Sequence, residues 1–429
     1  MNLPSPPFPA ASMTAGDLLV EHRVAEHFVA ELSRALHQNG LAADELEQNV
    51  AELANQLDLH VSVFATPTSI FFSFGEEDQY RTLLLRVKPG DINLTKLNEL
   101  QTLQRDVVED RLTLRQGRAQ LPEILKRPPQ YGPLLTTIAF GWASAAATLF
   151  FGGGIREWLL TLVVGMIVGA FAELLTKVPR ISRIYLPLSA LFASLVPYIV
   201  GLWLQPLSVE IATLGSLIVL LPGLTVTIAI NELATQNLAA GTARLAGAIV
   251  LLLHLTFGVA MGAALGKLLT TTPLNVSPPP IAEPLWYVAL LTAPAAFAIL
   301  FRARWQDILA ITATCILGFS MTRLASTVLG PEISGSAGSF FIGITGSLFA
   351  RWTGRPSSIL VVPGLTFLVP GSIGFKSIQM LLNDHVDSAV QGAFDMFLVA
   401  IGLVAGLLVA YTILPNRAAI RQRRPAATS

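Results

Sequence analysis

The residues best placed to do chemistry in this chain lie around two prolyl-glycyl pairs inside otherwise apolar stretches. Pro222-Gly223 opens the segment PGLTVTIAINE, and Pro363-Gly364 opens the segment PGLTFLVPG. Proline lacks a backbone donor and clashes with the preceding helical turn, so each pair predicts a broken helix. Broken helices at membrane depth are tolerated where their free N–H and C=O groups line a polar cavity, and secondary transporters bind substrates at such breaks. The two breaks are therefore predicted to form a substrate site.

Polar side chains cluster after the first break. Glu232 and Arg244 can neutralise each other, and they could equally hold the ammonium and carboxylate groups of a zwitterion; an interfacial helix with a structural ion pair is the alternative. The hydroxyls of Thr225, Thr227 and Thr366 are predicted to hydrogen-bond the substrate. The full predicted substrate-binding set is Pro222, Gly223, Thr225, Thr227, Asn231, Glu232, Arg244, Pro363, Gly364, Thr366, Pro370 and Gly371.

Three titratable residues are candidates for proton coupling. Glu232 follows the first break, Asp395 stands one turn inside the last apolar block, and His254 falls in the middle of IVLLLHLTFG. A carboxylate or imidazole within a membrane helix can take up and release a proton during transport. The alternatives are a headgroup-level position for Asp395 and a hydrogen-bonded structural role for His254.

The sequence offers little for an enzyme. The chain has no His-Glu-x-x-His motif, no P-loop and one cysteine, Cys315. The tripeptide at 318–320, GFS, resembles the nucleophile motif of intramembrane serine proteases, but no later apolar block carries the required histidine. We predict no enzymatic activity, no cofactor and no metal site. A net charge of zero gives no indication of a nucleic-acid partner.

Composition identifies the elements that must position these residues. The chain has 429 residues, 52% of them hydrophobic and 13% charged, which indicates a membrane protein. Residues 1–130 are mixed in composition, whereas 133–414 form apolar blocks of roughly 17–25 residues, long enough to cross a bilayer as helices. The predicted fold is thus an α-helical polytopic membrane protein preceded by a small soluble α+β domain.

Ten spans are predicted, and the two Pro-Gly-Leu-Thr segments, 141 residues apart, fall in the fourth and the ninth. Five spans is an odd number, so the second set must run upside down relative to the first, as an inverted 5+5 repeat. A weaker match at an offset of about 150 links LFFGGGIREWLL (149–160) to ILFRARWQDILA (299–310). The predicted spans are about 134–152, 158–176, 185–204, 208–231, 243–266, 285–301, 306–328, 335–350, 357–378 and 392–414.

Charge predicts the orientation, because Lys and Arg collect on the cytoplasmic side of membrane proteins. Fourteen of these residues fall on the side of the soluble domain and four on the other, so both termini are predicted to be cytoplasmic. The predicted organisation is a disordered tail (1–16), a soluble cytoplasmic domain (17–130), two five-helix membrane repeats (133–281 and 282–414) and a basic cytoplasmic tail (415–429).

The soluble domain is predicted from alternating patterns. Residues 17–58 repeat apolar positions at helical spacing, with Gly40 ending the first helix. HVSVFATPTSIFFSFG and YRTLLLRVKPG alternate as strands, and a helical segment with an N-cap at Asn93 follows. Nothing in this domain suggests catalysis, so gating or subunit contact is predicted for it.

With these residues identified, the chain resembles the bacterial threonine/serine exporter family. The similarity includes HVSVFATPTSIFFSF, LFFGGG, LPGLTVTIAINELATQNLAAGTARLAGA and VPGLTFLVPG, and it covers nearly the whole chain. The resemblance implies a soluble domain followed by ten spans that export small hydroxy amino acids using an ion gradient. In some relatives the two parts are separate chains assigned to dicarboxylate export, so succinate is an alternative substrate.

The functional hypothesis is a proton-coupled antiporter that exports threonine and serine across the cytoplasmic (inner) membrane of a bacterium. Its expected partners are the amino acid, protons, the lipid bilayer and a second copy of the chain in a homo-oligomer. Two other classes stay open. A channel would use the same polar breaks without alternating access, and a scaffold or sensor would use the soluble domain as its working part.

Overall fold

The computed structural model describes residues 15–75, 80–175, 177–178, 180–269, 283–368, 371–382 and 385–415. Most of the two predicted tails therefore lies outside the described residues. The chain folds as two compact units. One contains Met1–Ile92 with Lys96–Arg127, and the other contains Asn93–Thr95 with Pro128–Ser429.

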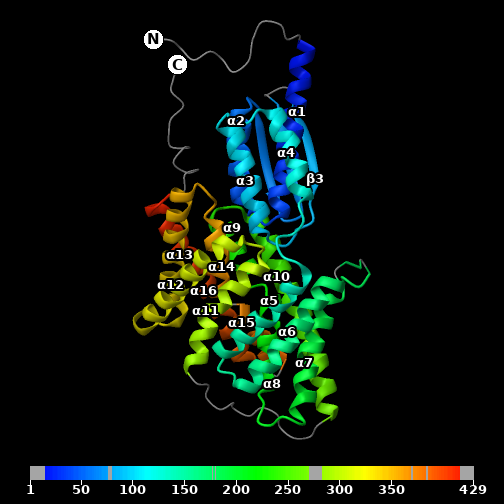
Figure 1. Ribbon diagram of the computed structural model, residues 1–429, viewed down its shortest axis with the longest axis vertical. Helices are drawn as coiled ribbons and strands as arrows, with labels where there is room; N and C mark the ends of the chain where they lie inside the picture. Colours follow the sequence, from blue (N-terminus) through cyan, green and yellow to red (C-terminus); the bar gives the residue numbers. More distant parts are fainter. Residues whose placement is uncertain are drawn as a thin grey trace. The chain divides into compact units, whose positions relative to one another are not determined.

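The first unit is a small α+β domain, as predicted. Its elements, blue to cyan in Figure 1, are α1 (Ala15–Gln38), α2 (Ala43–Gln56), β1 (Val61–Thr66), β2 (Ser69–Phe74), β3 (Arg81–Arg86), α3 (Leu94–Val108) and α4 (Leu114–Lys126). The strands form an antiparallel sheet in the order β1-β2-β3. Gly40 adopts a φ of 102°, which only glycine adopts readily, and this ends α1 where the sequence predicts.

The core of this domain follows from alternation along β2. Ile70, Phe72 and Phe74 point inward and are buried, because successive side chains of a strand face opposite sides of the sheet. Phe71, between them, is exposed and lies 6.1 Å from the ring of Phe64 on β1. The sheet thus buries one face and leaves aromatic side chains on the other.

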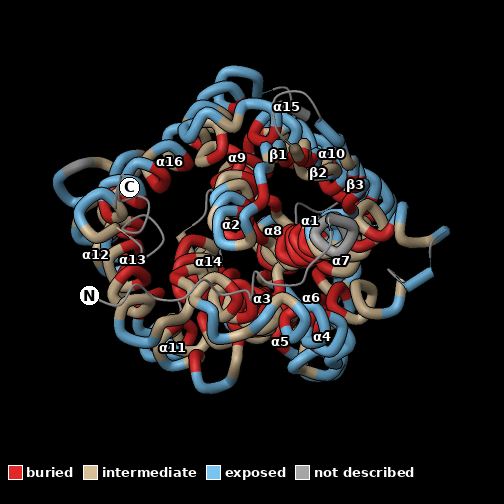
Figure 2. The backbone as a smooth tube through the Cα atoms, turned by 90° about the horizontal axis from the view of Figure 1, so that it is seen from above, coloured by how far each residue is buried: buried red, intermediate tan, exposed pale blue. Residues whose placement is uncertain are grey.

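The second unit is entirely helical where it is described. Its helices are α5 (Pro133–Phe150), α6 (Ile155–Leu175), α7 (Tyr185–Gly201), α8 (Val209–Leu217), η1 (Ile218–Leu220), α9 (Gly223–Ala234), α10 (Leu238–Leu269), α11 (Glu283–Leu300), η2 (Trp305–Asp307), α12 (Ile308–Leu329), α13 (Pro331–Thr353), α14 (Ser358–Leu368), α15 (Gly371–Leu382) and α16 (Val386–Ile413). Most of α8 is buried, as the red tube in Figure 2 shows, and so is much of α14. These two short helices therefore form the interior of the unit.

The number of membrane crossings is supported only in part. Seven helical stretches among the described residues are long and apolar enough to span a bilayer, and eight if the bent pair α8–η1 and α9 counts as one. Two further apolar helices, Tyr185–Gly201 and Pro284–Leu300, are shorter. The prediction of ten crossings needs both of these short helices to cross as well.

The first predicted break is present. The helical segment Val209–Leu220 ends just before Pro222, and α9 begins at Gly223 with a bend of 53° between the two. Pro222 itself has a φ of −80° and a ψ of 36°, outside helical geometry. Proline cannot donate to the preceding turn, and its ring restricts the residue before it, so the helix ends here.

The second predicted break is in the wrong place. Pro363 lies inside α14, and the helix continues past it to Leu368. One proline removes a single hydrogen bond, and the close packing of Gly364 on Ile342 supports the helix here. Residues 369–370 lie outside the described residues, and α15 is described from Gly371 onward.

Several features in the two parts of this unit recur at nearly the same offset. Gly371 follows Gly223 by 148 residues, close to the offset of 150 that separates the two corner segments. α5 and α11 also end in the same turn, with left-handed φ values of 81° at Gly152 and 54° at Arg302. The backbone hydrogen bonds around these two residues match one for one at that offset. A positive φ is uncommon for arginine, so the shared turn is a specific likeness.

The helix pairs of the two parts of the unit also correspond. α7 packs against α10, where a methyl group added to Gly258 would lie 2.3 Å from the Pro187 carbonyl oxygen. α13 packs against α16, where a methyl group on Gly406 would lie 2.1 Å from the Ser336 carbonyl oxygen. Each pair thus depends on a glycine that permits close backbone approach, 148 residues apart.

α5 and α11 pack together in antiparallel directions. Ala139 and Ala143, early in α5, cluster with Ala296, late in α11. Ala146, late in α5, clusters with Ala289, early in α11. Small side chains allow the two helices to approach closely along this contact.

Candidate functional site

Gly223, at the start of α9, lies against Gly371, the first described residue of α15. A methyl group added to Gly371 would lie 3.1 Å from both the backbone nitrogen and the Cα atom of Gly223. The first N–H groups of a helix have no partner within it, and its N-terminus carries a partial positive charge. The start of α9, at the break, therefore favours a negatively charged group in its vicinity.

The predicted threonines lie on α9 and α14, with differing geometry. Thr227 is buried and donates its hydroxyl hydrogen to the Gly223 carbonyl oxygen at 3.2 Å. Thr366 donates to the Val362 carbonyl oxygen on α14 at 2.8 Å. Thr225 is half-buried in the first turn of α9. A hydroxyl that donates to its own helix can still accept a hydrogen bond, so Thr227 and Thr366 are placed as acceptors.

Glu232 and Arg244 form the predicted ion pair. The Arg244 guanidinium donates from Nε to Oε2 at 2.9 Å and from Nη2 to Oε1 at 2.8 Å, a bidentate arrangement. The Glu232 side chain is fully buried, and that of Arg244 is 18% exposed. Charge-assisted paired bonds of this geometry are among the stronger hydrogen bonds in proteins, so α9 and α10 are firmly joined here.

The ion pair and the break lie at opposite ends of α9. Glu232 is nine residues beyond Gly223, which corresponds to about 13 Å along a helix. A single small amino acid cannot contact both places at once. Asn231 is half-buried beside Glu232 and belongs to the same end.

The other predicted proton carriers are not brought to the breaks. His254 is on the exposed face of α10 with Leu253 and Phe257. Asp395 is half-buried on α16, next to Met396, whose sulfur lies close to Gly374 of α15. Of the three predicted residues, only Glu232 is fully buried.

Pro363 and Gly364 have a packing role in this structure. A methyl group on Gly364 would lie 2.9 Å from Cγ2 of Ile342 on α13. The glycine therefore lets α14 approach α13 closely, and its surroundings are apolar. Gly371, which is also in the predicted set, is the glycine that lies against Gly223.

Two buried carboxylates in this unit were missed as site residues. Glu157 and Asp307 are 1% and 4% exposed. Both stand at the same place in the corner segments that match at an offset of about 150, which is the signal that could have identified them. Their polar contacts to distant segments leave no mark in the local sequence.

Tyr131 is a polar neighbour of Asp307. The hydroxyl of Tyr131, just before α5, donates to the Ala303 carbonyl oxygen at 2.7 Å. Burial, and then the negative charge of Asp307, raise the pKa of Tyr131. This phenol therefore remains a neutral hydrogen-bond donor.

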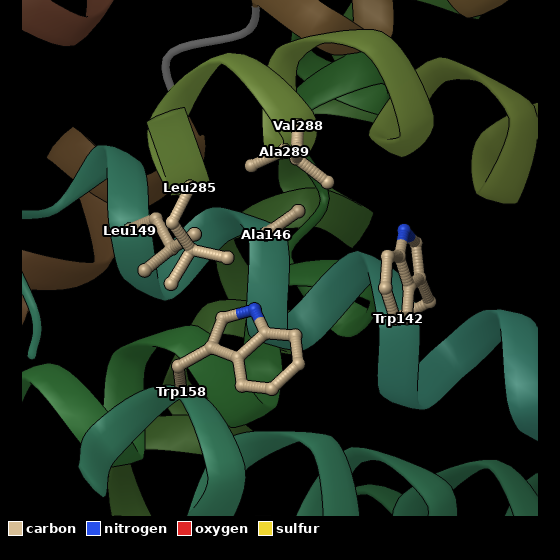
Figure 3. A pocket seen from close by; sticks show the side chains of 7 residues that line it. All are labelled: Trp142, Ala146, Leu149, Trp158, Leu285, Val288 and Ala289. Carbon is tan, nitrogen blue, oxygen red and sulfur yellow. The ribbon is translucent and has the colours of Figure 1, made fainter. Parts of the chain in front are cut away.

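A small apolar cavity of about 100 Å³ lies among α5, α6 and α11 (Figure 3). Figure 3 shows the indole rings of Trp142 and Trp158 on one side and Leu285, Val288 and Ala289 on the other. Ala146 and Leu149 complete the lining. Such a cavity suits a hydrocarbon group and disfavours a charge, so it is no site for a carboxylate or an ammonium group.

Comparison with known proteins identifies the family. A family model described as a threonine/serine exporter matches residues 27–266, which is more than half of the chain, and a second, described as "Threonine/Serine exporter, ThrE", matches residues 287–413. The chain belongs to the threonine/serine exporter family. The first match includes the break at Pro222 and the Glu232–Arg244 pair, and the second includes Asp307 and Gly371. The threonine/serine exporter family is one of exporters, and it is not known as a family of enzymes.

Curated relatives of this exporter-family chain are proteins of yeasts. It is 25% identical over 375 residues to "Pheromone-regulated membrane protein 10" of Pichia sorbitophila, which covers 82% of this chain and 36% of that protein. The protein of the same name from Saccharomyces cerevisiae is 26% identical over 423 residues, covering 91% of this chain and 54% of that protein. The chain thus spans between about a third and about half the length of these relatives. No solved structure matches it.

The predicted location is contradicted by these comparisons. A bacterial inner membrane was expected, but the curated relatives, including an uncharacterised protein of Schizosaccharomyces pombe that is 24% identical, are eukaryotic. A multi-pass membrane protein of the threonine/serine exporter family is what the comparisons and the helices support.

Proposed function

We propose that this protein is a secondary active transporter that exports small hydroxy amino acids, with the carboxylate of the substrate bound where α9 and α15 begin. The observation that carries the proposal is the contact between Gly371 and Gly223, where α9 begins after the break at Pro222. Secondary transporters direct the positive ends of half-helices at anionic groups of their substrates. Membership of the threonine/serine exporter family supports threonine and serine as the substrates.

The proposed architecture is an inverted repeat of five spans, with α5–α10 as the first half and α11–α16 as the second. Counted this way, α8 with α9 and α14 with α15 are the two broken spans, and the protein crosses the membrane ten times. The antiparallel packing of α5 on α11 supports inversion, because equivalent helices of inverted halves must run in opposite directions.

The offset between the halves supports the same architecture. The shared turns at Gly152 and Arg302, and the starts of α9 and α15, are separated by 150 and 148 residues. An approximately constant offset is the mark of an internal duplication. The offset of 141 between the Pro-Gly-Leu-Thr segments does not follow the register of the halves.

The remaining groups of an amino acid fit the ends of the breaks. The last carbonyl groups of a helix have no partner within it, so those of η1, at the break, can accept hydrogen bonds from a substrate ammonium group. Thr227 and Thr366 can each accept a hydrogen bond from the hydroxyl of threonine or serine, since their own hydrogens are donated to helix carbonyl groups.

Proton coupling is assigned to Glu232 in this proposal. A buried carboxylate that is paired with an arginine can exchange its partner for a proton when the helices move, and this would couple transport to a pH gradient. Asp395 is the second candidate because it is half-buried. His254 is exposed, so no proton relay through the protein interior is assigned to this residue.

A dicarboxylate such as succinate is the second candidate substrate. The N-terminus of α9 gives the break positive character, and the nearest described carboxylate on α9, Glu232, lies at the far end of that helix. Along α9, therefore, no described acid stands beside the break to balance an ammonium group. This observation alone favours a substrate with two negative charges.

Counterflow in liposomes decides between these substrates. Purified protein is reconstituted, the liposomes are loaded with unlabelled substrate, and entry of labelled threonine, serine or succinate is followed with and without an imposed pH gradient. The proposal predicts saturable exchange of threonine and serine that the gradient accelerates. Exchange of succinate alone would select the dicarboxylate, and flux that does not saturate would indicate a channel.

A further inference from the structure

Two buried carboxylates occupy equivalent positions in the two halves of the membrane unit. Glu157 is near the start of α6, and Asp307 ends η2 at the start of α12, 150 residues later. Each follows the turn with a left-handed residue that ends the preceding helix. A buried carboxylate costs several kcal/mol unless it is paired or hydrogen-bonded, so the contacts of these two are informative.

Glu157 joins the start of α6 to the start of α8. Its Oε2 accepts a hydrogen bond from the Gly154 backbone at 2.9 Å, and its Oε1 accepts one from the Ser208 backbone at 2.7 Å. Ser208 is the N-cap of α8. Both oxygens of the carboxylate are thus used, and one of them binds the end of a half-helix remote from the break.

Asp307 makes the equivalent connection with different chemistry. Its two oxygens accept hydrogen bonds from Nη1 and Nη2 of Arg355 at 2.6 and 2.5 Å. Arg355 stands three residues before Ser358, the first residue of α14. Gln205, 150 residues earlier in the chain, stands three residues before Ser208, the N-cap of α8. Arg355 is 22% exposed at its side chain, and Asp307 is 5% exposed.

Both carboxylates therefore hold the start of a helix that leads toward the Gly223–Gly371 contact. α8 leads to the break before Gly223, and α14 ends three residues before Gly371, so the position of each helix influences its glycine at the contact. If the halves are inverted, the starts of α6 and α12 lie at opposite faces of the membrane. One connection then belongs to each face.

We infer that Glu157 and Asp307 are positioning residues that keep the Gly223–Gly371 site closed to opposite faces of the membrane, Glu157 by holding α8 and Asp307 by holding α14. The inference rests on the proposed transport function, and it adds a pair of gates to the proposed site. Opening toward one face requires one carboxylate to release its half-helix while the other keeps its own. Glu157 holds α8 through the neutral backbone N–H of Ser208, and Asp307 holds α14 through the guanidinium of Arg355. Only the second connection is therefore an ion pair.

Access of a thiol reagent to the break tests the inference without needing a substrate. Cys315 is the only cysteine, so a Cys315→Ser background allows a single reporter, Leu224→Cys, in the first turn of α9. The full-length protein is reconstituted with known orientation, and a membrane-impermeant maleimide is supplied from one face at a time. Labelling rates are compared among Glu157→Gln, Asp307→Asn and a control, Glu173→Gln, whose exposed pairing with Lys177 at 3.7 Å is not part of either gate.

The expected result is a sided change. Asp307→Asn raises the labelling rate from the Asp307 face by roughly tenfold or more, and Glu157→Gln raises the labelling rate from the opposite face. The reason is that a hydrogen bond to a charged group contributes more free energy than a tenfold change in an equilibrium requires. Glu173→Gln changes neither rate. Asp307→Glu keeps the carboxylate, and the double variant Asp307→Arg with Arg355→Asp exchanges the two charges. Both variants are expected to label as slowly as the wild type. A protein that had only failed to fold would not regain slow labelling in this way.

Two results would overturn the inference. One is an equal increase from both faces for each variant, which indicates general loosening. The other is unchanged labelling in folded, monodisperse Asp307→Asn and Glu157→Gln proteins. The proposed function fails separately: if the wild type exchanges no threonine, serine or succinate yet labelling changes by face as expected, the gates stand and the transport proposal does not.

Discussion

Trp142 on α5 donates its indole N–H to the hydroxyl of Thr292 on α11 at 2.8 Å, and the two residues are 150 residues apart. In the proposed inverted repeat they are equivalent residues, and a residue contacts its own equivalent only close to the axis that relates the halves. Gly223 and Gly371, 148 residues apart, are a second pair of this kind. Under that proposal, the contact of the two glycines lies on the same axis as the α5–α11 contact.

The two prolines of the Pro-Gly-Leu-Thr segments should respond differently to substitution. Pro222→Ala allows a helical residue at the break between η1 and α9, so exchange of threonine should be lost. Pro363→Ala restores a donor inside α14 and should leave exchange intact. Counterflow of labelled threonine measures both. Loss of exchange in Pro363→Ala with normal folding would contradict this account.

The Glu232–Arg244 pair should show strong coupling in stability. Glu232→Gln leaves the Arg244 guanidinium without its carboxylate, and Arg244→Gln leaves the buried Glu232 carboxylate without its counter-charge. Each variant should therefore lower the free energy of unfolding by about 3–5 kcal/mol. The double variant should lose much less than the sum. Thermal unfolding in detergent gives the coupling energy from the four proteins, and additive losses would show that the pair acts as two independent side chains.

The hydrogen bond between Trp142 and Thr292 should show the same asymmetry at smaller size. Thr292→Val leaves the indole N–H without its acceptor next to an apolar cavity, which should cost about 1–3 kcal/mol. Trp142→Phe alone measures the cost in stability of the lost ring volume. The double variant Trp142→Phe with Thr292→Val removes both partners of the hydrogen bond. Once the cost of the ring volume is subtracted, the double variant should lose less stability than Thr292→Val alone.

His254 should be dispensable. It is on the exposed face of α10, so His254→Gln should leave both the rate of exchange and its response to a pH gradient unchanged. Glu232→Gln in the same assay should abolish the response to the gradient. A His254→Gln protein that exchanges threonine but no longer responds to the gradient would return this residue to the coupling mechanism.

The sequence predicts those features of the fold that have local signals. Apolar runs and alternation predict the two units, and a prolyl-glycyl pair predicts the break at Pro222. The break predicted at Pro363 is wrong, because this proline lies inside α14. It was predicted because PGLT at 363–366 repeats the first segment letter for letter, and four identical residues do not determine whether the surrounding packing supports the helix.

The site itself was only partly predictable for a related reason. The bond between Glu232 and Arg244 joins neighbouring helices, and their opposite charges in a short hairpin indicate the pair. Glu157 binds a backbone N–H 51 residues away, and a backbone partner has no signature in the sequence. Its importance emerges only when the two corner segments are compared at their common offset.

The central claim is that the contact between the starts of α9 and α15 forms the transport site, and Gly371 tests it most directly. Counterflow of labelled threonine is compared for the wild type, Gly371→Val, and Gly247→Val, a control glycine on α10 around which a methyl group would meet nothing within 4 Å. The account predicts saturable exchange in the wild type and the control, and a loss of roughly tenfold to a hundredfold in Gly371→Val, because small displacements at a binding site have effects of that size. Exchange at the wild-type rate in folded Gly371→Val protein would contradict it.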